Sequence, residues 1–247
     1  MKRIRAHELM DQPSPEPDLL AQSLTDLAWV NRFLGGTASL IHQLRQLLVG
    51  YQETHLRVLD VGAGGGDVLL SVGGWLAGRG AGEARGMRLR GVALDFGQQA
   101  VRFAAREFER EGRRADPDKK LDLYVVLGDG RALPFADRAF DVAISTTFLH
   151  HLESEDAVQT LIEMARVSRW GLVASDLRRT VMGHLVTSVI ARTVWRRHEY
   201  ARHDGPASMR AAYSLREAAA LAERAGLEAA VQAQPGFRWA LRWRRPA

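Results

Sequence analysis

The sequence predicts a doubly wound α/β domain built on a mostly parallel sheet. From residue 57 onward, short apolar segments alternate with longer segments whose apolar residues recur at helical spacing. This alternation is typical of βαβ units, in which helices cover both faces of a parallel sheet. The length of 247 residues suits one large domain, and the apolar fraction of 46% is that of a globular protein.

The first 50 residues differ from the rest of the chain. Three prolines between residues 13 and 17 favour an irregular arm. Apolar residues at helical spacing then predict one helix over residues 19–34 and another over residues 40–50. We therefore expect residues 1–50 to form an arm with lid helices, and residues 51–247 to form the main domain.

Seven segments of the main domain have the length and apolar character of strands. Helical patterns lie among the first five, which predicts that these five strands are parallel. The last two segments are close in sequence and favour an antiparallel hairpin at the sheet edge. The strand segments are 57–61, 89–94, 121–127, 140–144, 171–175, 227–232 and 237–241, and the helical patterns are 68–76, 98–111 and 156–167.

An insert at about 178–212 follows the fifth predicted strand. Its first part has apolar residues on one helical face and arginines at both ends, whereas residues 202–204 are polar and predict a loop. A capping box of Ser214 and Glu217 then predicts the start of another helix, over residues 214–225.

Composition excludes several classes of function. The chain has no cysteine, which excludes disulfides, thiolate metal sites and a cysteine nucleophile. With 34 basic and 29 acidic residues the net charge is only +5. No signal segment follows Met1 and no apolar run is long enough to span a membrane, so we expect a soluble, cytoplasmic protein.

The basic C-terminus resembles a nucleic-acid-binding segment only superficially. Arginines alternate there with aromatic residues. Alternation along a strand places Trp239 and Leu241 on one face and Arg238 and Arg242 on the other, which predicts a terminal strand with a solvated basic face. We therefore expect no nucleic-acid partner.

A glycine-rich turn follows the first predicted strand. Gly62, Gly64 and Gly66 allow positive φ angles and close approach of a ligand, and the helix after them offers free N–H donors. Asp67 stands where the NAD-type fingerprint needs its last glycine, so that fingerprint fails. No Lys-Ser/Thr pair follows, so a P-loop fails too.

The stretch Asp60-Val-Gly-Ala-Gly-Gly-Gly66 resembles motif I of class I S-adenosylmethionine-dependent methyltransferases. The resemblance covers about residues 57–176 and implies a Rossmann-like methyltransferase fold with S-adenosyl-L-methionine as cofactor. Asp95 ends the second strand, where the family places the carboxylate that holds the ribose, and Asp129 resembles the residue that accepts from the adenine amine. The implied cofactor-binding residues are Asp60, Gly62, Gly64, Gly66, Asp95, Phe96, Asp129, Gly130, Ser145 and Thr146.

The loop after the fourth strand indicates a small-molecule acceptor. Ser145-Thr-Thr-Phe148 lacks the prolines of the signature with which nucleobase and amide methyltransferases grip a planar amine. The Leu-His-His-Leu sequence that follows resembles quinone, polyketide and phenolic methyltransferases. Residues 9–36, 174–179 and 202–208 are similar to bacterial methyltransferases that accompany type III polyketide synthases.

Two adjacent histidines in this loop are candidates for the catalytic base. Histidine ordinarily titrates near neutral pH, which would suit His150 or His151 to remove a proton from a phenol or enol. The alternative is that one of them only packs against a neighbouring helix. Candidate acceptor contacts are Arg32, Phe148, Arg178 and His203. No acidic triad suited to a catechol-binding Mg²⁺ is evident, so we expect no metal.

The apolar face of the insert leaves several interpretations open. It can form the wall of an acceptor pocket, cover the sheet, or contact a membrane surface or a second subunit in a homodimer. A quinone C-methyltransferase at the membrane surface is therefore one alternative function. A non-catalytic partner protein with the same fold is another, although an intact glycine turn and Asp95 argue against it.

Overall fold

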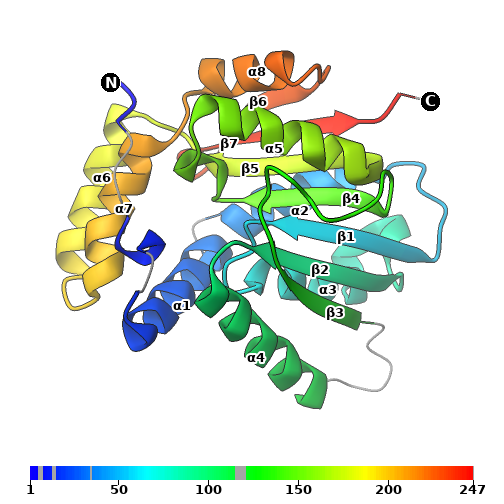
Figure 1. Ribbon diagram of the computed structural model, residues 1–247, viewed down its shortest axis with the longest axis horizontal. Coiled ribbons are helices and arrows are strands. Elements are labelled where there is room, and N and C mark those ends of the chain that lie inside the picture. Colours follow the sequence, from blue (N-terminus) through cyan, green and yellow to red (C-terminus); the bar gives the residue numbers. More distant parts are fainter. Residues whose placement is uncertain (5–7, 13–14, 34, 115–120, 247) are drawn as a thin grey trace.

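A seven-stranded sheet forms the centre of the protein, in the order β3-β2-β1-β4-β5-β7-β6 (Figure 1). The computed structural model describes residues 1–4, 8–12, 15–33, 35–114 and 121–246. The strands are β1 (His55–Val61), β2 (Arg88–Asp95), β3 (Leu121–Leu127), β4 (Phe140–Thr146), β5 (Ser168–Leu177), β6 (Ala230–Gln234) and β7 (Arg238–Arg244).

The pairing of the strands confirms the predicted doubly wound fold. Strands β1 to β5 pair in parallel, and β4 is buried along its whole length because helices cover both faces of the sheet. The predicted hairpin is present: β6 and β7 pair antiparallel, and β7 lies between β5 and the edge strand β6. The order of the parallel strands reverses between β1 and β4, and ligands bind at such a point in doubly wound sheets.

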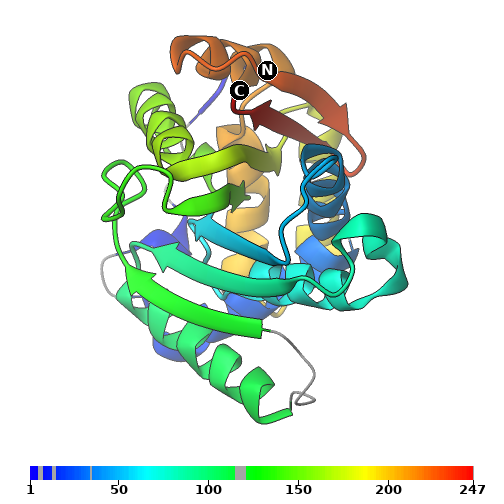
Figure 2. The same ribbon diagram turned by 90° about the vertical axis from the view of Figure 1, so that its right-hand side faces the viewer.

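Helices pack on both sides of the twisted sheet (Figures 1 and 2). On one side, α2 (Gly36–Leu47), α3 (Asp67–Ala77) and α4 (Gln98–Arg114) bury apolar residues such as Leu44 and Leu69. On the other side, α5 (Ser154–Val167) and α8 (Leu215–Arg224) contribute Leu161 and Leu221 to a second core. Because α2 packs directly on β5 and β7, it belongs to the core of the main domain.

A third group of helices lies beyond the carboxyl ends of the parallel strands (Figure 1). It consists of α1 (Pro17–Phe33), α6 (Val181–Thr193) and α7 (Glu199–Ala211), with a short 3₁₀ helix, η1 (Leu9–Asp11). Helix α7 packs against α6, α1 and η1. These segments come from distant parts of the sequence and together cover the edge of the sheet at which the glycine turn lies.

The predicted loop at residues 202–204 is wrong, because these residues lie within α7. Gly205 and Pro206 follow them, and both residues normally disfavour a helix interior. Tertiary contacts outweigh that local preference: Asp204 is buried and its carboxylate accepts hydrogen bonds from the backbone N–H groups of Leu9 and Met10. The polar sequence therefore reflects a buried contact with the N-terminal segment.

The predicted capping box at the start of α8 is present. Ser214 Oγ accepts from the Glu217 N–H at 3.3 Å, and the Glu217 carboxylate accepts from the Ser214 N–H at 2.7 Å. The same carboxylate pairs with Arg179 at 2.8 Å. Burial tends to raise the pKa of Glu217, but Arg179 and the Ser214 N–H outweigh it and lower the pKa to about 2.

We expect Glu217→Gln to lower the free energy of unfolding by about 0.5–1 kcal/mol at pH 7, a modest value because the carboxylate is partly exposed. A depressed carboxyl pKa stabilises the folded state above pH 4.5, and this contribution is lost as the pH falls toward 2. The difference in the free energy of unfolding between wild type and variant, measured by urea unfolding, should therefore be smaller at pH 3 than at pH 7. Glu223→Gln, on the exposed side of the same helix, is the control and should change stability by less than about 0.5 kcal/mol.

Candidate active site

The glycine turn between β1 and α3 brings backbone close to the loop after β4. Gly62 has φ +71°, and a Cβ there would lie 2.2 Å from Cγ of Phe148. Gly66 has φ +76°, and a Cβ there would lie 2.6 Å from Phe108. Only glycine fits both positions, so this turn places Phe148 directly against the end of β1.

Asp95 ties the glycine turn to the end of β2. Its carboxylate accepts hydrogen bonds from the N–H groups of Gly64 and Gly97, each at 2.8 Å. Burial raises the pKa of Asp95, while these N–H groups and the charge of His151 lower it in part. The side chain remains partly accessible, and Phe96 beside it is 78% exposed. Each carboxylate oxygen therefore keeps a lone pair for a ligand hydroxyl.

Two further carboxylates lie beneath the turn. Asp60 is 1% exposed, and its Oδ2 has no hydrogen-bond partner among the described residues. Burial and the charges of Asp67 and Asp95 raise its pKa well above the usual range. Asp67 accepts a hydrogen bond from Nδ2 of Asn31 at 3.3 Å. Three carboxylates around one turn, one of them unpaired, suit a cationic or amine-bearing ligand.

Arg238 is buried, which corrects the prediction of a solvated basic face on the last strand. It is 1% exposed, and its guanidinium donates to Thr147 Oγ1 at 3.0 Å and to Asn31 Oδ1 at 3.3 Å. The nearby charges of Asp67 and Asp176 compensate its own. Alternation along the strand gave the wrong prediction for Arg238, because polar groups at the carboxyl ends of the parallel strands are its partners. Arg238 thereby connects α1 and the loop after β4 to the sheet.

Asp129 lies in the loop that follows β3 and is paired with an arginine of the same loop. Its carboxylate meets Arg131 at 2.7 Å, and Arg131 also reaches Asp156 at 3.3 Å. The hydrogen bonds from Arg131 lower the pKa of Asp129. The neighbouring Gly130 is buried against Val61 and Phe148. The two residues thus lie at the same edge of the sheet as the glycine turn.

The end of β4 forms the floor between the glycine turn and the histidine pair. Ser145 Oγ donates to the Val61 carbonyl at 2.9 Å. Thr146 is 6% exposed, and its Oγ1 has no partner in the described part of the chain. Phe148 then covers Gly62 and Gly130. The predicted residues Ser145, Thr146 and Phe148 therefore line one region.

The two predicted histidines lie in a cluster of carboxylates. His150 and His151 belong to the 3₁₀ helix η3 (Leu149–His151), and their ring centroids are 4.2 Å apart. Nδ1 of His150 lies 2.7 Å from Asp176, and Nδ1 of His151 lies 2.6 Å from Asp11. Both Nε2 atoms face Glu8, at 3.5 Å from His150 and 3.9 Å from His151.

The surroundings of His150 favour its protonated form. Burial tends to lower its pKa, but the carboxylates of Asp176 and Glu8 outweigh burial and raise the pKa to about 10. Glu8 is itself buried, and despite that burial its histidine neighbours and Ser208 lower its pKa to about 2. Sequence motifs could not reveal Glu8 or Asp176 as partners of His150, because neither lies near it in the chain.

The other predicted acceptor contacts are dispersed. Arg32 is exposed on α1, with its guanidinium 5.5 Å from the ring of Phe33. Arg178 follows β5, and its buried Nε lacks a partner among the residues described. His203 pairs with Asp204 at 2.8 Å and is 51% exposed. Of this group, only Phe148 contacts the glycine turn.

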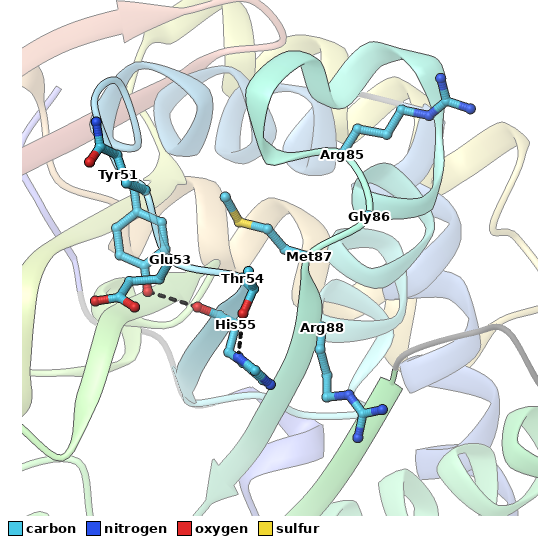
Figure 3. A pocket seen from close by; sticks show the side chains of 9 residues that line it. Tyr51, Glu53, Thr54, His55, Arg85, Gly86, Met87 and Arg88 are labelled. Carbon is cyan, nitrogen blue, oxygen red and sulfur yellow. Dashed lines mark hydrogen bonds between the residues drawn. The ribbon is translucent and has the colours of Figure 1, made fainter.

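A separate hollow lies at the opposite edge of the sheet (Figure 3). Its lining includes Tyr51, His55 and Arg88. His55 and Arg88 begin β1 and β2, whereas the glycine turn and Asp95 end them. This hollow therefore has no part in the site built around the glycine turn.

The fold and the turn are those of class I methyltransferases, whose cofactor is S-adenosyl-L-methionine. Residues 58–171 match the model of a family described as a methyltransferase domain. No curated protein matches the sequence. The chain thus has the fold of S-adenosylmethionine-dependent methyltransferases, with the matched domain at its centre.

Solved structures resemble the protein over almost its whole length. A SAM-dependent methyltransferase from Aquifex aeolicus aligns with TM-score 0.62 and 18% identity, covering 91% of this chain and 97% of that one. Human N-acetylserotonin methyltransferase, solved with SAM, aligns with TM-score 0.61 and 13% identity, covering 94% of this chain and 57% of its own. An O-methyltransferase family 2 protein from Planctomyces limnophilus, solved with apigenin, aligns with TM-score 0.57 and 15% identity. This alignment covers 96% of this chain and 63% of that one.

Proposed function

We propose that the protein transfers a methyl group from S-adenosylmethionine to an oxygen of a small organic acceptor of phenolic or polyketide-like chemistry. The observation that carries this proposal is the Asp95 carboxylate, held against the glycine turn of a methyltransferase domain. Two of the similar structures are an O-methyltransferase solved with apigenin and N-acetylserotonin methyltransferase. The likeness of residues 9–36, 174–179 and 202–208 to methyltransferases accompanying type III polyketide synthases supports the same acceptor class.

The carboxylates at the turn fit the cofactor. Asp95 would hold the ribose hydroxyls, since its two oxygens are fixed by backbone N–H groups and remain partly accessible. Asp60, with an unpartnered buried oxygen, would meet the amine of the methionine moiety through water. Asp129 and Gly130 would hold the adenine, with Phe96 exposed nearby to pack on it. When bound, the cofactor supplies the methyl group on a sulfonium.

The acceptor would lie between the end of β4 and the helices α1, α6 and α7. Ser145, Thr146 and Phe148 line the side facing the cofactor. His151, whose charge acts on Asp95, would accept the acceptor's hydroxyl proton in its neutral form, whereas the surroundings of His150 favour its protonated form and a charge-stabilising role. Arg32, Arg178 and His203 are the further contacts that we propose for the acceptor.

The outer face of α6 favours a second candidate, a quinone C-methyltransferase that works at a membrane surface. Val181, Met182, Leu185 and Val189 are each more than half exposed on this helix. Arginines at both ends of the insert could contact anionic lipid. Among the described residues, no helix is long and apolar enough to cross a membrane. Sedimentation with anionic vesicles tests this candidate, since an oxygen methyltransferase without a membrane role would stay in the supernatant.

Calorimetric titration with S-adenosylmethionine and S-adenosylhomocysteine tests the main proposal. We expect micromolar binding of both, followed by methyl transfer to members of a panel of phenols and aromatic polyketides. The same panel should include quinones, which separates oxygen from carbon acceptors. Absence of cofactor binding by the folded protein would contradict the proposal and favour a non-catalytic partner protein.

A further inference from the structure

Three side chains converge on one point beside the glycine turn: those of Glu8, His150 and His151. We propose that these three side chains bind a divalent transition-metal ion of the zinc type. One ligand atom from each residue lies within 4.8 Å of the other two. The residues come from the N-terminal segment and from η3, so the site exists only in the folded chain.

The distances suit ligands of one ion better than hydrogen bonds. Nε2 of His150 lies 3.5 Å from Oε1 of Glu8, and Nε2 of His151 lies 3.9 Å from Oε2. A good hydrogen bond is shorter, at about 2.7–3.2 Å. Ligands at about 2.0–2.2 Å from a tetrahedral zinc are separated by about 3.4 Å. Nε2 of His150 is buried and makes no hydrogen bond within the described chain, so it is free to coordinate.

Each histidine is already oriented as a metal ligand. Metal-binding histidines commonly donate the other ring N–H to a carboxylate, which fixes the tautomer and the ring. Here Nδ1 of His150 lies 2.7 Å from Asp176, and Nδ1 of His151 lies 2.6 Å from Asp11. This leaves both Nε2 atoms directed at Glu8, whose Oε1 accepts a hydrogen bond from Ser208 at 2.6 Å.

The charge around the point favours a dication. The carboxylates of Glu8, Asp11 and Asp176 lie next to the two imidazoles, and the carboxylate of Asp204 lies close enough to Glu8 for their charges to interact. A divalent ion with two neutral imidazoles carries the same charge as two imidazolium rings without a metal. The acidic surroundings can therefore be balanced equally well by a bound ion.

The donor set identifies the class of ion. Two imidazoles and one carboxylate suit zinc and neighbouring transition metals, whereas magnesium and calcium prefer oxygen ligands alone. This proposal departs from the sequence-based expectation of no metal, which rested on the lack of an acidic triad for magnesium. Three protein ligands leave coordination positions open for an oxygen of the acceptor; this use of the ion rests on the proposed function, whereas its binding does not.

A titration of the full-length protein with Co²⁺, after dialysis against a chelator, tests the site. We expect saturable 1:1 binding with visible absorption bands, displaced by Zn²⁺ but not by excess Mg²⁺. Glu8→Gln and His151→Ala should each weaken Co²⁺ binding at least 100-fold. Asp176→Asn, which removes the charge behind His150, should weaken it about 10- to 100-fold.

His198→Ala is the matched control. His198 also pairs with a carboxylate, Asp26, at 2.6 Å, but lies at the start of α7 and outside the cluster. We expect unchanged Co²⁺ affinity in this variant. Circular dichroism of every variant checks that the fold is retained.

Two results would overturn the proposal: absence of saturable Co²⁺ binding by the folded protein, or equal affinity in wild type, Glu8→Gln and His151→Ala. The cluster would then be an ion-pair network that holds residues 8–12 on the sheet. Calorimetry with S-adenosylhomocysteine on the same samples separates this proposal from the proposed function. Cofactor binding without Co²⁺ binding refutes the metal site alone, and the reverse refutes the methyltransferase site alone.

Discussion

Replacement of Asp95 by alanine is expected to weaken S-adenosylmethionine binding by about 30- to 150-fold. The change removes the acceptor that we assign to both ribose hydroxyls, and hydrogen bonds to a charged group contribute about 2–3 kcal/mol. The carboxylate is already fixed by the Gly64 and Gly97 N–H groups, so it needs no reorganisation to bind a ligand. Calorimetric titration measures the effect.

Asp95→Ala also removes the two hydrogen bonds from Gly64 and Gly97, which stabilise the glycine turn and the end of β2. Urea unfolding of the variant therefore belongs with the titration, since a folded variant is required for the comparison. Asp122→Ala is the matched control: it removes a carboxylate from the adjacent strand β3, where Asp122 meets the exposed Arg88 at 3.9 Å. Affinity should be unchanged in the control. Equal affinity in wild type and Asp95→Ala would contradict the ribose assignment.

The elements of the proposed cofactor site could be predicted from sequence because their signals are local. Gly62, Gly64 and Gly66 stand within five residues, and the turn that they make depends on their own φ angles. Asp95 and Asp129 end predicted strands, and parallel strands bring such ends to one edge. The fold followed from the same alternation of short and long apolar segments.

The surroundings of the histidine pair and of Arg238 could not be predicted in the same way, because their contacts are long-range. His150 was singled out by its place in the loop after β4, yet its partners Glu8 and Asp176 come from the N-terminal segment and from the end of β5. Alternation along the strand predicts an exposed Arg238, and only the tertiary structure shows that its guanidinium meets Asn31. No pattern in one sequence reports such pairs.

The errors made from sequence concern the same region. The loop predicted at residues 202–204 is part of α7, and the arginine predicted to face solvent is buried. Both errors arise where polar residues at the carboxyl edge of the sheet meet one another instead of water. In each case polar residues were assigned to the surface. A polar side chain can instead be buried when other protein groups satisfy its hydrogen bonds.

Replacement of His151 by alanine is expected to lower kcat by 10²- to 10⁴-fold while leaving S-adenosylmethionine affinity intact. The reason is that our proposal places His151 at the acceptor, where loss of a group that promotes proton removal affects the chemical step alone. The ring of His151 pairs with Asp11 and Glu8 and its side chain is 19% exposed, so the variant should fold. Methyl transfer to the best acceptor from the panel measures the rate.

His150→Ala is expected to lower kcat as well, but with a loss of stability that His151→Ala does not show. His150 is 1% exposed, and its Nδ1 is bonded to the buried Asp176, so the alanine variant leaves a buried carboxylate with one partner fewer. Comparing kcat with the free energy of unfolding in the two variants therefore separates a chemical role from a structural one. His42→Ala, at an exposed position on α2, should change neither quantity. Full activity in both His150→Ala and His151→Ala would show that the pair only anchors the N-terminal segment.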